Sequence, residues 1–158
     1  MAEPRLVADE MLGRLARYLR MLGADTIYAR GWTDDEIVQR SAADGRTVLT
    51  RDRLLARRSA GALLLTSPRL DAQLRSVWQA FPALAHTPQF LRCTECNGEL
   101  GPLAPRRAVT GAPGIPWDRI TTGLVVMECR ACGHPYWEGS HTRSVRDRLL
   151  EWEASGAP

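Results

Sequence analysis

The sequence predicts an α/β domain, with a parallel sheet flanked by helices, followed by a small cysteine-rich module. Over residues 1–85, short strand-like apolar runs alternate with amphipathic helical patterns. Strands that alternate with helices through short loops indicate a parallel sheet joined by right-handed crossovers. All four cysteines come later in the chain, after residue 92. We therefore divide the chain into a first domain, 1–85, and a second module, 86–158.

Four strands and four helices are expected in the first domain, in alternation. Gly23 and Gly45 follow two of the helical patterns, where a glycine commonly ends a helix. Thr33-Asp-Asp-Glu36 is a capping-box pattern that begins another helix. The expected strands are 5–9, 25–29, 46–50 and 61–66, and the expected helices are 11–22, 33–44, 52–60 and 70–81.

The second module contains two Cys-x-x-Cys pairs, separated by 32 residues. Each pair can present two thiolates to one tetrahedral ion, so the spacing predicts a structural Zn²⁺ site. Two disulfides or a redox pair are the alternatives, and disulfides fit poorly in a chain that shows no secretion signal. His134, next to the second pair, is a substitute ligand. The predicted zinc ligands are Cys93, Cys96, Cys129 and Cys132.

The rest of the second module is expected to be a linker, a loop, two strands and a helix. Gly and Pro are frequent over 98–123, which predicts a protruding loop. Strands are expected at 124–127 and 136–137, and a closing helix at 142–152. Because the two parts have separate apolar patterns, we expect the first domain to stay folded when zinc is removed.

Composition excludes several classes of protein. Of the 158 residues, 44% are hydrophobic and 25% are charged, as in globular domains and unlike disordered, collagenous or coiled-coil chains. The chain lacks an apolar run of about 18 residues, so we expect no membrane span. The segment Met1 to Arg5 lacks the layout of a signal peptide, and we expect a cytoplasmic protein.

All 21 basic residues are arginine, and the net charge is +3. Residues 1–91 carry 13 arginines against 10 acidic residues, whereas residues 92–158 carry 8 against 8. A GC-rich coding bias explains the total. Arginine is also suited to bidentate phosphate contacts.

Three carboxylates are expected where strands end or a following helix begins: Asp9, Asp34 and Asp52. In an open parallel sheet such positions converge on the crevice where ligands bind. Clustered carboxylates suit Mg²⁺ or Mn²⁺, which prefer hard oxygen ligands. Taken singly, Asp34 has the alternative of interacting with the first turn of its helix, and Asp52 that of capping the next one.

Arginines crowd the same region of the sequence. One interpretation is a solvated helix face, and the other is a phosphate-binding rim around an acidic metal site. The arginines concerned are Arg14, Arg17, Arg20, Arg46, Arg51, Arg53, Arg57 and Arg58, among which Arg51, Arg53, Arg17 and Arg14 are the candidate substrate contacts.

Several motifs of the sequence resemble those of known nuclease families. Leu49-Thr-Arg-Asp52, preceded by Asp34, resembles the segment of PIN-domain nucleases that carries their last two acidic ligands. The opening from Val7 to Gly23, the four cysteines and Tyr136-Trp-Glu-Gly-Ser-His141 together resemble the Mut-seven C-terminal ribonuclease family, over about residues 5–143. That family combines a PIN-like domain with a zinc ribbon.

The resemblance implies a metal-dependent ribonuclease with Asp9, Asp34 and Asp52 as its catalytic acids and metal ligands. Larger PIN nucleases carry a fourth acid, which has no clear equivalent here. His141 is expected either to anchor the ribbon or to contact the substrate. The second-tier candidates for the missing acid are Glu10, Asp35, Glu36 and Asp71.

We therefore expect hydrolysis of RNA phosphodiester bonds at a Mg²⁺ or Mn²⁺ site, beside a structural Zn²⁺. The missing fourth acid favours an alternative: an RNA-binding adaptor that kept the fold without catalysis. A toxin-like nuclease restrained by a protein partner or inhibitor is a third interpretation.

Overall fold

The first domain contains a four-stranded parallel sheet. The structure is a computed structural model, and it describes residues 4–105, 113–120 and 123–155. The strands are β1 (Arg5–Ala8), β2 (Asp25–Tyr28), β3 (Thr47–Thr50) and β4 (Leu63–Leu64), in the order β2-β1-β3-β4. All neighbouring strands are parallel, which confirms the predicted α/β class.

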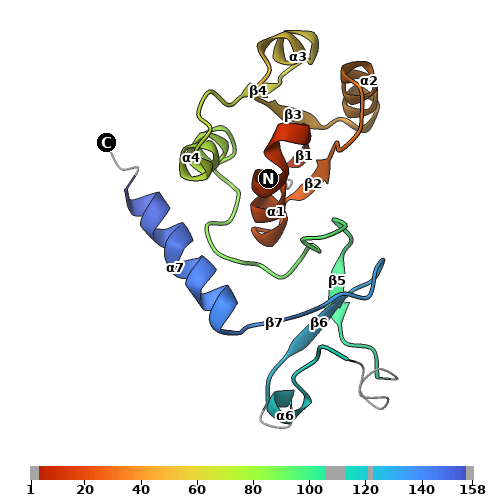
Figure 1. Cartoon of the computed structure of the whole chain (residues 1–158), viewed down its shortest axis with the longest axis vertical. Helices are drawn as coiled ribbons and strands as arrows, with labels where there is room; N and C mark the ends of the chain where they lie inside the picture. The colour runs from red at the N-terminus through yellow and green to blue at the C-terminus, as the bar shows by residue number, and fades with distance from the viewer. Residues whose placement is uncertain (1–3, 106–112, 121–122, 156–158) are drawn as a thin grey trace.

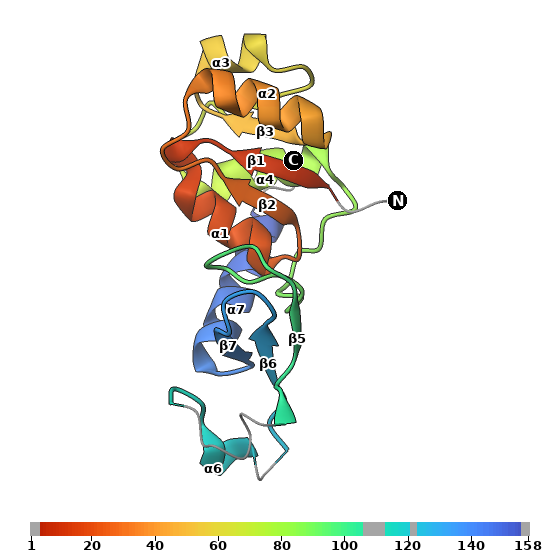
Figure 2. The same cartoon turned by 90° about the vertical axis from the view of Figure 1, so that its right-hand side faces the viewer.

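Four helices cover these strands, and the first three of them connect one strand to the next (Figures 1 and 2). The capping box on Thr33 and Glu36 forms as predicted, and Gly45 ends that helix with a left-handed φ of 62°. The expected helix 11–22 begins differently, because a 3-10 turn (Glu10–Leu12) capped by Asp9 precedes it. The helices are α1 (Gly13–Met21), α2 (Asp34–Asp44), α3 (Arg53–Arg58) and α4 (Leu70–Ala80).

Both faces of the sheet are buried under helices. Leu6 and Ala8 pack into a large core with α1 and α4, whereas Val7, between them, packs into a smaller core with α2 and α3. Consecutive residues of a strand point to opposite faces, so a strand that is apolar throughout requires helices on both sides. The first domain is therefore a three-layer structure, in which the carboxyl ends of β1, β2 and β3 lie along one edge.

The second module is a three-stranded antiparallel sheet, which we call the ribbon. Its strands are β5 (Leu100–Pro102), β6 (Val126–Cys129) and β7 (Pro135–Trp137), in the order β5-β6-β7. The strand expected at 124–127 thus begins two residues later. The expected loop 98–123 contains β5 and the short helix α6 (Trp117–Ile120), while its residues 106–112 and 121–122 lie outside the described residues.

The last helix, α7 (Ser140–Ala154), leaves the ribbon and returns to the first domain (Figure 1). Its Val145 and Leu149 belong to the same core as α1 and α4. Trp152 packs against Tyr18 of α1, with their ring centroids 5.8 Å apart. A helix that follows the ribbon in sequence therefore completes the core of the first domain. None of the described helices is long and apolar enough to cross a membrane.

The loop of residues 93–98, which we call the knuckle loop, is bound to the exposed edge strand β2. The Asn97 side-chain oxygen accepts the Thr26 amide at 3.0 Å, and the Asn97 amide donates to Asp25 at 2.7 Å. Arg20 is buried, and its guanidinium donates to the backbone carbonyls of Thr26, Thr94 and Glu95 at 2.8–3.1 Å. An unpaired edge strand would expose backbone groups that recruit other chains, and the knuckle loop covers them.

Asp25 should make the stability of the folded protein depend on pH. Its side chain is 14% exposed and accepts two 2.9 Å hydrogen bonds from Arg46. Although burial acts to raise the pKa of Asp25, the hydrogen bonds from Arg46 and Asn97 lower it to about 2. A carboxylate whose pKa is lower in the folded state stabilises above its ordinary pKa of about 4, and this stabilisation is lost as the pH falls toward 2.

We expect Asp25→Asn to lower the free energy of unfolding by about 1.5–3 kcal/mol at pH 7, the scale of a hydrogen bond to a charged group. The difference from the wild type should shrink between pH 4 and pH 2. Urea unfolding across this range measures the difference, with the zinc content of both proteins determined at each pH. Asp44→Asn, at a half-exposed carboxylate beside the same arginine, should change stability by less than about 0.5 kcal/mol. A difference that is constant with pH would contradict the assignment.

Candidate active site and metal centre

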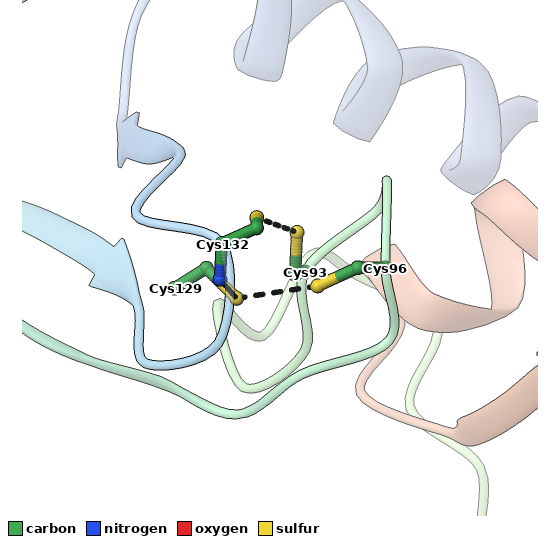
Figure 3. A group of neighbouring side chains, drawn as sticks. All are labelled: Cys93, Cys96, Cys129 and Cys132. Atoms are coloured by element: carbon green, nitrogen blue, oxygen red, sulfur yellow. Dashed lines mark hydrogen bonds between the residues drawn. The ribbon is translucent and has the colours of Figure 1, made fainter.

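The four predicted zinc ligands converge on one point (Figure 3). Cys93 and Cys96 come from the knuckle loop, Cys129 ends β6, and Cys132 lies in the turn before β7. All four sulfur atoms lie within 4.8 Å of one another. The Cys93 and Cys132 sulfurs are 3.7 Å apart, and those of Cys96 and Cys129 are 3.4 Å apart. A tetrahedral zinc with bonds of about 2.3 Å separates its sulfur ligands by about 3.8 Å.

The surroundings of the sulfurs also fit a bound cation. The Cys132 backbone amide points at the Cys129 sulfur at 3.4 Å. Although burial acts to raise the pKa of Cys129, this amide and that of Ala131 lower it to about 7. Burial raises the pKa of Cys96 to about 12. A dication lets all such thiols ionise together, so the cluster is able to hold a structural metal ion such as Zn²⁺.

Gly98 allows the two halves of the cluster to approach closely. A Cβ atom added there would lie 2.8 Å from the Cys129 sulfur and 3.2 Å from the Cys96 sulfur. The first distance is shorter than carbon and sulfur tolerate and the second is a tight contact, so a larger residue would require the Cys129 side to shift.

Asp9 lies at the carboxyl end of β1, at the edge where the catalytic acids are predicted. Its side chain is only 5% exposed. One carboxylate oxygen accepts the Met11 amide at 2.9 Å, and the other accepts the Thr50 hydroxyl. Thr50 is the last residue of β3, and its hydroxyl oxygen accepts the Asp52 amide at 2.9 Å. Thr50 therefore links Asp9 to the segment that carries Asp52.

Asp52 and Asp34 lie at the starts of α3 and α2. Asp52 caps α3, since one of its oxygens accepts the amides of Leu54 and Leu55 at 2.6 Å and 3.3 Å. Asp34 is the first residue of α2, with a half-exposed side chain 3.8 Å from the Arg58 guanidinium. Among the described residues, only the cysteines form a group of three or more ligands within 4.8 Å. The three carboxylates thus lie at the same edge of the sheet, but their oxygen atoms are not all within 4.8 Å of one another.

The family model for the Mut7-C RNAse domain matches residues 4–149, nearly the whole chain. The protein belongs to the Mut7-C RNAse domain family. No curated protein and no solved structure matches it significantly. Membership indicates a ribonuclease-like function, with RNA as the implied substrate.

Three of the four second-tier acids have other partners in this Mut7-C chain. Asp35 forms an ion pair with Arg58, and Glu36 accepts the Thr33 amide in the capping box. Asp71 forms ion pairs with Arg69, which precedes α4, and with Arg75 on α4. The hydrogen bonds, above all the one from Arg69, lower the pKa of Asp71 to about 2, although burial acts to raise it. Glu10 is exposed directly after Asp9, and within the described chain its carboxylate has no hydrogen bond or ion pair.

Two arginines of the predicted phosphate-binding rim are structural instead. Arg20 is buried and bound to backbone carbonyls of the knuckle loop. Arg46 is 8% exposed and bound to Asp25, away from the acidic edge. Sequence spacing alone could not separate these from exposed arginines, because burial depends on where the knuckle loop and β2 meet.

The four candidate substrate contacts among the remaining arginines form two groups. Arg51 and Arg53 flank Asp52, are exposed, and make no side-chain hydrogen bond or ion pair in the described chain. Arg14 and Arg17 instead line a cavity of about 740 Å³ between α1, the knuckle loop and α7. His141 lines the same cavity from the first turn of α7. Sequence reasoning missed Arg30 and Arg148, which also line it, because no local pattern links them to α1.

Proposed function

We propose that this Mut7-C protein is a metal-dependent ribonuclease that hydrolyses RNA phosphodiester bonds at the carboxyl edge of the sheet. The observation that carries the proposal is the burial of Asp9 without a cationic partner: in the described chain no basic group lies within ion-pairing distance of it. Buried charges in proteins are paired or coordinate metal ions. The family match supplies the reaction class.

The residues at this edge have separable roles in the proposal. Asp9, with Asp52 and Asp34, would hold one or two Mg²⁺ or Mn²⁺ ions, for which carboxylate oxygens are suitable ligands. Such an ion, when bound, lowers the pKa of a coordinated water and offsets charge at the transferring phosphate. Thr50 orients Asp9 through its hydroxyl and the Asp52 segment through its oxygen. Arg51 and Arg53 would contact phosphates on either side of Asp52.

A cleavage assay on labelled RNA tests the proposal. Zinc-loaded protein should cleave with Mn²⁺ or Mg²⁺ and be inactive without them, and Asp52→Asn should lower the rate by about 100-fold or more, because a metal ligand is lost. Zinc content and circular dichroism confirm that the variant is folded. Cleavage without added metal, or an undiminished rate in the variant, would refute it.

A second candidate function is a non-catalytic RNA-binding adaptor. It is favoured by the arrangement of the carboxylates, since Asp34 faces Arg58 and the acids do not form a closed set. RNA binding without cleavage under every metal tested would establish this alternative.

A further inference from the structure

Two cavities adjoin along the seam between the first domain and the ribbon. The first, of about 740 Å³, lies between α1, the knuckle loop and α7, and the second, of about 480 Å³, lies between the knuckle loop, β7 and the start of α7. They share five lining residues, and we call the two together the seam groove. The residues that line both cavities are Arg17, Met21, Thr94, Glu95 and His141.

The seam groove is strongly basic, although the chain as a whole carries 21 basic and 18 acidic residues. Among its described lining residues Glu95 is the one acid. Arg14, Arg30 and Arg148 are exposed, and within the described chain their guanidinium groups have no hydrogen bond or ion pair. The arginines that line it are Arg14, Arg17, Arg20, Arg30, Arg92, Arg119 and Arg148.

The ribbon end of the groove is aromatic. The rings of His134 and Tyr136 lie 4.9 Å apart, and the Tyr136 hydroxyl is held by the Thr94 amide at 3.1 Å. Trp137 follows on β7 and is half-buried. Phe90 completes this end. Aromatic rings at one end of a groove whose other end presents unpaired arginines form a surface on which unpaired bases can stack while phosphates bind.

The other end of the groove approaches the acidic edge. Gly13 and Tyr28 line the first cavity, and the Tyr28 hydroxyl donates to the Glu10 carbonyl at 2.9 Å. Glu10 directly follows Asp9. A strand of nucleotides bound in the seam groove would therefore run along α1 from the ribbon toward the carboxylates.

We propose that the seam groove binds single-stranded RNA, with phosphates on Arg14, Arg30 and Arg148 and an unpaired base against Trp137. The sequence motif Tyr136 to His141 then belongs to substrate recognition, because Trp137 and His141 line the groove. Duplex RNA, whose bases are stacked and paired, cannot place a base in the aromatic end. The direction of the RNA strand rests on the proposed function, whereas RNA binding rests on the groove alone.

Equilibrium binding tests the proposal without depending on cleavage. Zinc-loaded protein in buffer without Mg²⁺ or Mn²⁺ is titrated into labelled oligouridylate and into a duplex of equal length. We expect the single strand to bind more tightly, and Trp137→Ala to weaken its binding by about 5- to 160-fold, the range for one stacked base. Trp137→Phe, which keeps a ring, should retain most of the affinity.

Arg148→Ala and Arg14→Ala should each weaken binding and flatten the dependence of log affinity on log salt by about 0.7, the value for one phosphate contact on a single strand. Arg143→Ala is the matched control, since Arg143 is exposed on the same helix and lines neither cavity. Equal losses at Arg143 and Arg148, equally tight duplex binding, or no RNA binding would overturn the proposal. If Trp137→Ala does not fold, the comparison of Arg148→Ala with Arg143→Ala tests the proposal. Intact binding without cleavage would contradict only the proposed catalytic function.

Discussion

Asp9→Asn is expected to lower the rate of metal-dependent RNA cleavage by about 100-fold or more while leaving the protein folded. Asp9 is buried, accepts two hydrogen bonds, and in the described chain has no basic partner. Asparagine fills the same volume and still accepts a hydrogen bond, but it removes the charge that would attract a cation. Losses of metal affinity from ligand-supporting residues already reach about 10- to 100-fold, and a ligand itself should contribute at least as much.

Thermal unfolding provides a readout that does not depend on activity. Mn²⁺ should raise the melting temperature of the wild type, since a ligand that binds only the folded state stabilises it, and this rise should be absent in Asp9→Asn. Asp44→Asn is the control, because Asp44 is an exposed carboxylate at the opposite edge of the sheet. A rate within twofold of wild type in folded Asp9→Asn would exclude Asp9 from the site.

Thr50 offers a graded version of the same test. Thr50→Val removes the hydroxyl that donates to Asp9 and accepts the Asp52 amide, so Mn²⁺ affinity should fall by about 10- to 100-fold. Thr50→Ser restores the hydroxyl and should recover most of that affinity. Equal defects in the two variants would indicate a packing effect instead of a positioning role.

Cys93→Ser is expected to abolish zinc binding and unfold the ribbon. It should also destabilise β2, the edge strand of the first domain that contacts the knuckle loop. Cys93 is buried at the start of the knuckle loop, whose neighbouring residues bind Arg20, Asp25 and Thr26. Structural zinc contributes about 10–16 kcal/mol to the folding of isolated zinc-finger peptides, so the ribbon should not survive its loss. Sequence alone predicts that the first domain is unaffected, but these contacts couple the two parts.

Hydrogen exchange of the Thr26 amide measures this coupling at one site. That amide donates to Asn97 in the folded protein, so its protection should fall when zinc is lost. Asn97→Gly separates the two causes, because glycine accepts the left-handed φ of 67° at this position but offers no side-chain acceptor. Thr26 should then exchange faster while zinc stays bound. Unchanged protection in Cys93→Ser would show that the first domain does not depend on the ribbon.

The elements of the first domain could be predicted because their signals are local. The capping box on Thr33, the glycine at Gly45 and the short apolar strands act within a few residues of one another. The 3-10 turn after β1 could not be predicted in this way. It forms because Asp9 accepts the Met11 amide while the same carboxylate is held by Thr50, which lies 41 residues later.

The sequence by itself determined the α/β class, the order of strands and helices in the first domain and the two cysteine pairs, because each depends on local residue patterns and spacing. The motifs it shares with the family indicated membership. Only the tertiary structure decided which arginines are free. Arg20 and Arg46 are held by the knuckle loop and Asp25, whereas Arg14 and Arg148, 134 positions apart in the sequence, line one groove. The physical reason is that burial and electrostatic pairing depend on which segments meet after folding, and α7 meets α1 only because its apolar face completes the core of the first domain.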